Sequence, residues 1–278
     1  MLSRINFGGC PFVYKVEGEG EPVVLIQGVG LHGDGWLPQT AVLRSGYRCL
    51  TFDNRGMGQS QPAGGPITIE QMVMDTLAVM DSAGMKGAVH LVGHSMGGAV
   101  AQAIALAHPD RVKSLALLCT SARGADATRL SWRLMQVGIR TRVGTRRMRR
   151  YAFLEIIMAP EYLATQDRDA LAEKLAPLVG HDLADTPPVA MKQLRALARF
   201  DATLSLSKLA GIPTLVLSAE HDIIFPPKFG RLLAAGIPGS RYVEIADAAH
   251  GVPIQRADVV NEALYNCFQN NSASDRRT

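Results

Sequence analysis

Short apolar runs recur along the first 120 residues and again after residue 212. They occupy residues 23–26, 48–52, 88–92, 114–118, 213–218 and 241–245. Because apolar residues fill these runs without alternating with polar ones, they predict strands buried on both faces of a parallel sheet. The first three runs stop at Gly28, Asp53 and Gly93, where we expect loops to begin.

Segments with helical spacing of apolar residues separate these runs. We predict helices over residues 69–83, 97–108, 227–235 and 259–268. Thr68 is a candidate N-cap for the first helix and Gly84 a candidate stop. The second helix is rich in alanine, so it can pack closely on a sheet, and Pro109 ends it. Alternation of strands with helices predicts a doubly wound α/β fold.

The pattern changes between residues 123 and 203, where no strand is predicted. Apolar residues there recur at helical spacing, as in Leu171, Leu175 and Leu178. We therefore expect a core made of residues 1–122 and 204–270, a helical insertion over 123–203, and a disordered tail over 271–278.

Composition supports a folded chain. The 278 residues are 47% hydrophobic and 19% charged, with a net charge of +4. This is enough apolar material for a large core and unlike a disordered chain. The four cysteines are scattered, which favours buried free thiols in a reducing compartment. With no secretory signal and no apolar run near 20 residues, we expect a cytoplasmic protein without a membrane span. The oligomeric state is left open.

Arginine is concentrated in residues 123–150, where Asp126 is the one acid. The run contains Arg123, Arg129, Arg133, Arg140, Arg142, Arg146, Arg147, Arg149 and Arg150. One interpretation is a solvated helical face. The other is an anionic substrate or an acidic surface partner attracted by the local charge. Aromatic residues at stacking spacing do not accompany the arginines, so we predict no nucleic-acid partner.

A Gly-x-Ser-x-Gly motif over residues 93–97 lies between a predicted strand and the alanine-rich helix. A sharp strand-to-helix turn forces its serine into strained backbone geometry, and small residues at both ends avoid a clash. The Ser95 hydroxyl would then stand at the carboxyl edge of the sheet, next to a helix N-terminus that favours negative charge. Ser95 is therefore the candidate nucleophile.

A serine nucleophile requires a base. His94 is too close to the serine in sequence, and His90 and His108 fall within a strand and at a helix end. His250 follows the strand over 241–245 in a small-residue loop, from which an imidazole can reach the serine. We therefore predict His250 as the base.

The base in turn requires a carboxylate to orient it. Asp222 follows the strand over 213–218, and its rivals Glu220 and Asp247 are interpreted as surface acids. With Asp222, the acid lies between the nucleophile and the base along the chain, which is the order of an α/β-hydrolase.

Backbone N–H groups must stabilise the oxyanion. We predict one from Met96, directly after the serine, and one from Val29 in the loop over residues 27–30. The glycines of this loop do not form Gly-x-Gly-x-x-Gly, and no P-loop lysine follows them, which argues against nucleotide binding.

Together these residues resemble the α/β-hydrolase family, from about residue 10 to 268. Residues 93–98 resemble its nucleophile turn, and residues 52–60 its structural Asp-x-Arg-Gly-x-Gly-x-Ser turn. The resemblance implies an α/β-hydrolase fold, with a mostly parallel central sheet flanked by helices and a helical cap formed by the insertion. One departure is Gln27, which stands where the family often has histidine.

The Asp-Asn-Arg-Gly turn of residues 53–56, Trp36 and the chain length look most similar to the branch with 3-oxoadipate enol-lactonases and small carboxylesterases. The resemblance implies a serine hydrolase that cleaves a small-molecule ester or lactone through an acyl-enzyme, without a metal or cofactor. A serine at position 95 disfavours dehalogenases and epoxide hydrolases, which use aspartate there. Cofactor-free perhydrolases or haloperoxidases, C–C bond hydrolases and a ligand-binding protein with a slow triad remain alternatives.

By the same resemblance, some apolar residues of the insertion line the substrate pocket. The candidates are Trp132, Met135, Phe153 and Ile157.

Overall fold

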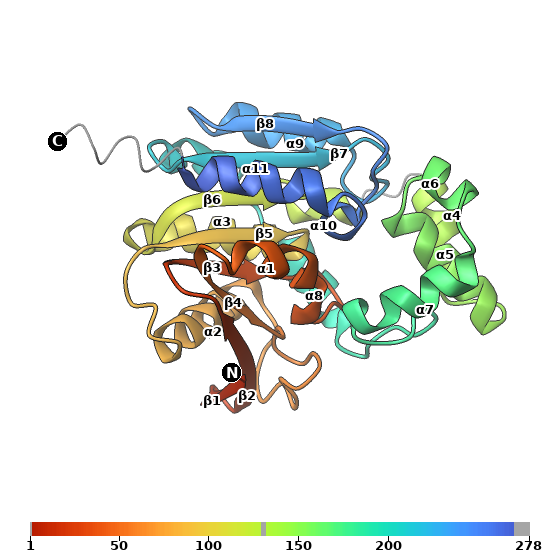
Figure 1. Ribbon diagram of the computed structural model, residues 1–278, viewed down its shortest axis with the longest axis horizontal. Coiled ribbons are helices and arrows are strands. Elements are labelled where there is room, and N and C mark those ends of the chain that lie inside the picture. The colour runs from red at the N-terminus through yellow and green to blue at the C-terminus, as the bar shows by residue number, and fades with distance from the viewer. Residues whose placement is uncertain (1, 129–131, 270–278) are drawn as a thin grey trace.

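The computed structural model contains one eight-stranded sheet with the strand order β1-β2-β4-β3-β5-β6-β7-β8 (Figure 1). The structure describes residues 2–128 and 132–269, so the predicted disordered tail lies outside the described residues. The strands are β1 (Leu2–Phe7), β2 (Cys10–Glu17), β3 (Glu21–Ile26), β4 (Tyr47–Phe52), β5 (Val89–His94), β6 (Val112–Leu118), β7 (Thr214–Ala219) and β8 (Arg241–Ile245). β1 and β2 pair antiparallel and β2 runs antiparallel to β4, whereas β3 to β8 form a parallel sheet.

Helices cover both faces of this sheet (Figure 1). One face carries α1 (Leu37–Leu43), α10 (Val252–Gln255) and α11 (Ala257–Gln269). The other face carries α2 (Ile69–Ser82), α3 (Met96–Ala107) and α9 (Pro227–Gly236). Short 3-10 helices are η1 (Gly33–Trp36), η2 (Pro109–Arg111), η3 (Gly124–Thr128) and η4 (Thr203–Leu209). The observed architecture is the α/β-hydrolase fold predicted from the sequence.

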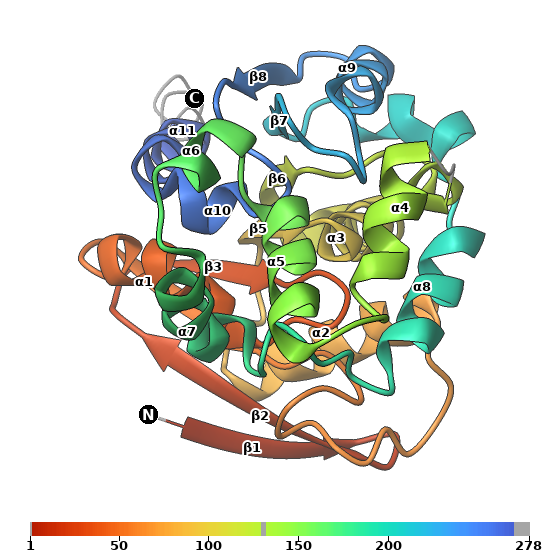
Figure 2. The same cartoon turned by 90° about the vertical axis from the view of Figure 1, so that its right-hand side faces the viewer.

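Five further α-helices lie between β6 and β7 in the part of the chain that the structure describes. They are α4 (Trp132–Arg140), α5 (Arg146–Ile157), α6 (Pro160–Ala164), α7 (Arg168–Val179) and α8 (Ala190–Arg199), and we call them the cap helices. Figure 2 shows them in front of the carboxyl ends of the parallel strands. Residues of α5, α6 and α7 form an apolar cluster of their own, separate from the two clusters that flank the sheet.

Successive side chains of the central strands lie on opposite faces of the sheet. In β3, Val24 and Ile26 pack in the cluster on the side of α2 and α3, whereas Val23 and Leu25 pack on the side of α1 and α11. All four are fully buried. Because side chains alternate across a strand, burial of both faces requires a continuous apolar run, which is the pattern that predicted these strands.

The first two strands and α1 were not predicted. β1 alternates between exposed and half-exposed residues at the edge of the sheet, so it lacks the continuous apolar run of the central strands. The predicted helix over 69–83 matches α2, and the hydroxyl of its N-cap Thr68 accepts a hydrogen bond from the Gln71 N–H. Among the described residues, each helix is too short or too polar to cross a bilayer.

A buried ion pair stabilises the turn after β4. The Arg55 guanidinium, fully buried, donates to both carboxylate oxygens of Asp75, at 2.7 and 2.5 Å. Its remaining N–H groups donate to the backbone carbonyls of Phe7, Gly8 and Ala63. Arg55 therefore joins the edge hairpin, the turn after β4 and α2, as expected of a structural turn.

Replacing one member of this pair is expected to destabilise the fold. Asp75→Asn keeps the shape of the side chain but leaves the buried guanidinium without its counter-charge. We expect the free energy of unfolding to fall by about 3–5 kcal/mol, as measured by urea denaturation. Asp81→Asn, which removes an exposed partner of Arg111, is the matched control and should cost less than about 1 kcal/mol. Equal effects of the two changes would contradict this account.

Candidate active site

Ser95 occupies a strained turn between β5 and α3. Its backbone has φ 55° and ψ −119°, a left-handed conformation that costs a non-glycine residue about 1–3 kcal/mol. A Cβ at Gly97 would lie 2.1 Å from the carbonyl oxygen of Ile26, and one at Gly93 would lie 2.3 Å from the carbonyl oxygen of Gly97. The small residues of the motif are thus required by contact between the turn, β3 and α3.

His250 and Asp222 form a hydrogen-bonded pair at the ends of neighbouring strands. His250 Nδ1 lies 2.8 Å from Asp222 Oδ2, and Asp222 Oδ1 accepts from the N–H groups of Ile224 and Phe225 at 2.8 and 2.9 Å. Burial opposes ionisation of Asp222, but the charge and hydrogen bond of His250 and these N–H groups lower its pKa below the usual value. Asp222 is therefore held as an ionised carboxylate that faces Nδ1 of the His250 ring.

Ser95 and His250 line the same cavity of about 640 Å³. Both are almost fully buried, with 6% of each exposed. The rival acids Glu220 and Asp247 are exposed, and the Glu220 carboxylate accepts from the N–H of Asp247. The structure thus brings the predicted serine and histidine to one cavity and places the predicted aspartate behind the histidine.

His94 supports the segment that carries His250. Its Nε2 lies 2.8 Å from the His250 carbonyl oxygen, and because a carbonyl only accepts, Nε2 carries the proton. The ring meets Trp36 edge-on. Burial and the nearby His250 lower the pKa of His94 from its ordinary 6.5 to about 3, so the ring stays neutral. His94 was not predicted as a site residue because it is next to Ser95 in sequence, and no periodic pattern marks a contact that spans 156 residues.

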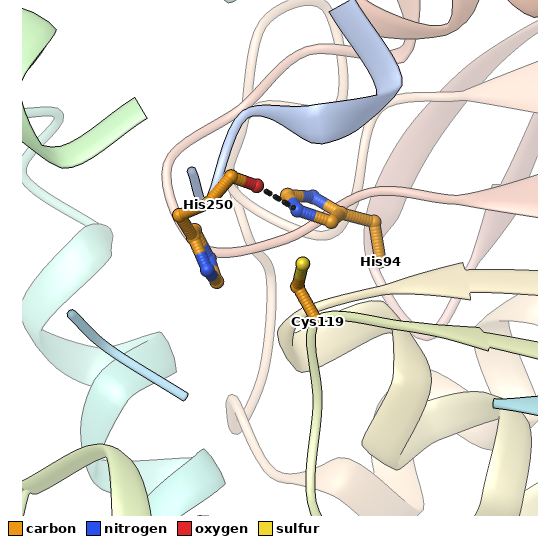
Figure 3. Close-up of side chains that lie close together, drawn as sticks. All are labelled: His94, Cys119 and His250. Carbon is orange, nitrogen blue, oxygen red and sulfur yellow. Dashed lines mark hydrogen bonds between the residues drawn. The ribbon is translucent and has the colours of Figure 1, made fainter. Parts of the chain in front are cut away.

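His94, Cys119 and His250 form the one buried group of candidate metal ligands in the described residues, with donor atoms within 4.8 Å of one another (Figure 3). Both rings already use a nitrogen in a hydrogen bond, His94 to the His250 carbonyl and His250 to Asp222. Burial and the nearby Asp222 raise the pKa of the Cys119 thiol well above 9.0, which disfavours the thiolate that a metal requires. The cluster fits packing behind the site better than metal binding.

The loop over residues 27–30 is held by hydrogen bonds on both sides. Asn54 Nδ2 donates to the Gln27 carbonyl at 2.9 Å, and Gln27 Oε1 accepts from the Gly28 N–H. Val29 lines the cavity, and its N–H donates to no protein acceptor in the described residues. The loop thus has a free N–H group at a residue that lines the cavity, directly after Gly28, where a Cβ would lie 3.0 Å from the Ser95 Cβ. Met96, the other predicted donor, is the first residue of α3, where N–H groups lack intrahelical acceptors.

The cap helices hold the same loop. Gln193 on α8 is fully buried, and its Oε1 accepts from the Gly30 N–H at 2.9 Å. His181, just after α7, places Nε2 3.0 Å from the Gly30 carbonyl oxygen. Neither residue was predicted from the sequence. An isolated polar residue in an amphipathic helix, such as Gln193, is normally assigned to the solvent face, and His181 lies in a loop without a periodic pattern.

The cap also holds the segment that carries the histidine. The carbonyl oxygens of Ile156 and Ile157, at the end of α5, accept from the N–H groups of His250 and Gly251 at 3.3 and 3.0 Å. The cap helices are thus hydrogen-bonded to both loops that border Ser95.

Most of the cavity wall is apolar. Of the predicted substrate contacts, Met135, Phe153 and Ile157 line the cavity. Trp132 is 69% exposed and is not among the lining residues. Trp132 is the first residue of α4, and its side chain is exposed to solvent. Its aromatic character alone therefore did not predict a contact with the cavity.

Comparison with known proteins places this geometry in a family. Residues 21–257 match the model of the alpha/beta hydrolase fold. The chain belongs to the α/β-hydrolase family. It is an enzyme of that family, a hydrolase.

Similar proteins extend over almost the whole chain. The chain is 30% identical to "Putative carbamate hydrolase RutD" of Azorhizobium caulinodans, covering 92% of this chain and 94% of that one. The enol-lactonase structure from Burkholderia xenovorans is similar with a TM-score of 0.79 and 28% identity, covering 96% of this chain and all of the other. A thermophilic esterase from Thermogutta terrifontis matches with a TM-score of 0.79 and 27% identity, covering 98% and 99% of the two chains.

The neutral state of His94 predicts how stability depends on pH. The unfolded chain binds a proton at this residue below about pH 6.5, whereas the folded chain does so only near pH 3, so acidification favours unfolding. This residue should contribute a loss of about 1.4 kcal/mol per pH unit well below pH 6.5. His94→Gln retains a hydrogen-bond donor but does not titrate, so in this variant the free energy of unfolding should depend less steeply on pH, by about one bound proton. Urea denaturation at pH 5, 6 and 7 measures this dependence. An equal pH dependence of the unfolding free energy in the native protein and the variant would contradict the prediction.

Proposed function

We propose that this chain is a serine esterase or lactonase that works through an acyl-enzyme on Ser95. The observation that carries the proposal is one apolar cavity bordered by a serine on a strained strand-to-helix turn and by a histidine paired with a buried aspartate. Geometry of this kind serves acyl transfer, in which a serine attacks a carbonyl and a histidine moves the proton.

In the first half of the proposed reaction, His250 Nε2 accepts the Ser95 proton while Oγ attacks the carbonyl carbon. Asp222 holds the other ring nitrogen at 2.8 Å and stabilises the imidazolium as it forms. Collapse of the tetrahedral intermediate expels the alcohol, which takes the proton from His250. In the second half, His250 activates a water molecule that releases the acid and restores the serine.

The developing oxyanion is assigned to the N–H groups of Val29 and Met96. The free N–H of Val29 and the position of Met96 at the start of α3 support this assignment. Donors that are already oriented lower the barrier without reorganising, and removal of one such donor costs other enzymes about 100–1000-fold in kcat.

Esters and lactones are favoured as substrates because the cavity wall is mainly apolar and its volume suits a small organic molecule. The similar enol-lactonase and esterase, at 28% and 27% identity, support this choice.

Ser95→Ala should abolish turnover of short 4-nitrophenyl esters and lactones. Loss of the nucleophile costs about 10⁶-fold in serine hydrolases. A fluorophosphonate probe should label the native protein and leave the variant unlabelled, and an unchanged melting temperature would show that the variant is folded. Hydrolysis by the variant at the native rate would refute the proposal.

Gln193 is proposed as a positioning residue, because it fixes the peptide group that follows Val29. Its buried Nε2 has no partner in the described residues, an arrangement that costs stability and is tolerated here beside the site. Gln193→Met keeps the length but removes the acceptor. It should lower kcat about 10–100-fold with little change in KM.

Affinity for a trifluoromethyl ketone, which mimics the oxyanion, should fall in parallel with kcat/KM in Gln193→Met. Lys192→Met, the same replacement at an exposed position of the same helix, is the control and should leave both quantities unchanged. A fall in thermal stability with kcat and inhibitor affinity intact would assign Gln193 a structural role only.

A further inference from the structure

Several arginines of the cap helices are paired with nearby carboxylates on the outer surface. The pairs are Arg140 with Glu155, Arg146 with Asp182 and Asp185, Arg147 with Asp169, and Arg150 with Asp182. Most of the charge that makes this segment basic in sequence is therefore balanced by acids brought together by the fold.

Arg142, in the loop between α4 and α5, and Arg195, on α8, differ from these arginines. Both line the cavity that contains Ser95, and neither is paired with a carboxylate among the described residues. Arg142 Nη2 donates to Met191 Sδ at 3.3 Å, and Met191 precedes Arg195 by one turn of α8. The Arg142 guanidinium therefore lies against the same stretch of α8 that carries Arg195.

We assign these arginines to the mouth of the cavity, because both line it and both are exposed to solvent. Ser95 is 6% exposed, whereas Arg142 and Arg195 belong to the exposed residues of the cap. Asp185 also lines the cavity, but its two oxygens accept from Arg146 at 2.9 Å each. A ligand that extends from the serine to the mouth thus meets apolar wall first and then uncompensated positive charge.

We propose that the substrate carries a carboxylate at the end remote from the scissile carbonyl, bound by Arg142 and Arg195. This inference rests on the proposed esterase or lactonase function and specifies its substrate class. Guanidinium groups present paired N–H donors that match the two oxygens of a carboxylate. The apolar wall between the serine and the arginines fits a hydrocarbon segment that joins the ester to the carboxylate.

Half-esters of dicarboxylic acids test the proposal. The substrates are mono-4-nitrophenyl suberate and its analogue with a terminal amide, which differ in charge but hardly in shape. The native enzyme should favour the acid in kcat/KM on the order of tenfold, and added salt should reduce the preference. In Arg142→Gln/Arg195→Gln the preference should disappear through a rise in KM for the acid, with the amide unchanged.

Arg140→Gln/Arg147→Gln is the matched control. It removes the same charge from the paired arginines, neither of which lines the cavity, and should retain the preference for the acid. Equal rates for acid and amide in the native enzyme, or equal losses in the two double variants, would overturn the proposed carboxylate site while leaving esterase function intact.

A binding measurement separates this inference from the catalytic proposal. Calorimetry on the Ser95→Ala variant compares octanoate with octanamide, and hydrolysis plays no part in it. Tighter binding of octanoate that is lost with Arg142→Gln/Arg195→Gln would support the carboxylate site even if no ester were cleaved. Equal binding of the two compounds would refute it.

Discussion

The contact between the Ser95 turn and the end of β3 constrains the centre of this structure. Gly97 lies so close to the Ile26 carbonyl that any side chain there would displace one of the two elements. This contact sets how near α3 approaches the sheet and thereby where the loop after β3 runs. The strain at Ser95 persists because buried strands on both sides leave the backbone no room to relax. The serine, the first turn of α3 and the loop over residues 27–30 are thus placed by one packing arrangement.

The cap helices further restrict the positions of the loops beside the serine. They donate or accept hydrogen bonds at Gly30, His250 and Gly251, which belong to the two loops beside the serine. A movement of the cap would therefore alter the positions of the proposed base and of the proposed oxyanion donor together. This explains how an insertion that contributes no residue to the serine, histidine and aspartate set can still influence the rate of a reaction there. It also links substrate shape, which the cap wall determines, to the alignment of the reacting groups.

Much of the fold could be predicted from the sequence, because the central strands are buried on both faces and their apolar runs are continuous. The residues around Ser95 were predictable for a local reason, since each candidate follows the end of such a strand. β1 was missed because an edge strand needs only partial burial. The supporting contacts of His94 and Gln193 span 156 and 163 positions and involve backbone partners, which leave no trace in local periodicity. Trp132 is the opposite case. Its aromatic side chain suggested a place in the pocket, but its position on α4 leaves it exposed to solvent.

The electrostatics behind the site depend on which buried groups remain neutral. Burial keeps His94 uncharged and keeps the thiol of Cys119 protonated, so neither adds charge beside His250. Asp222 is the exception, since two backbone N–H groups and the imidazole compensate its burial. An imidazolium at His250 would therefore face a fixed negative charge with neutral groups around it, in surroundings where water screens little. Two polar side chains that stay neutral thus belong to this arrangement, because a positive charge at His94 would repel an imidazolium at His250.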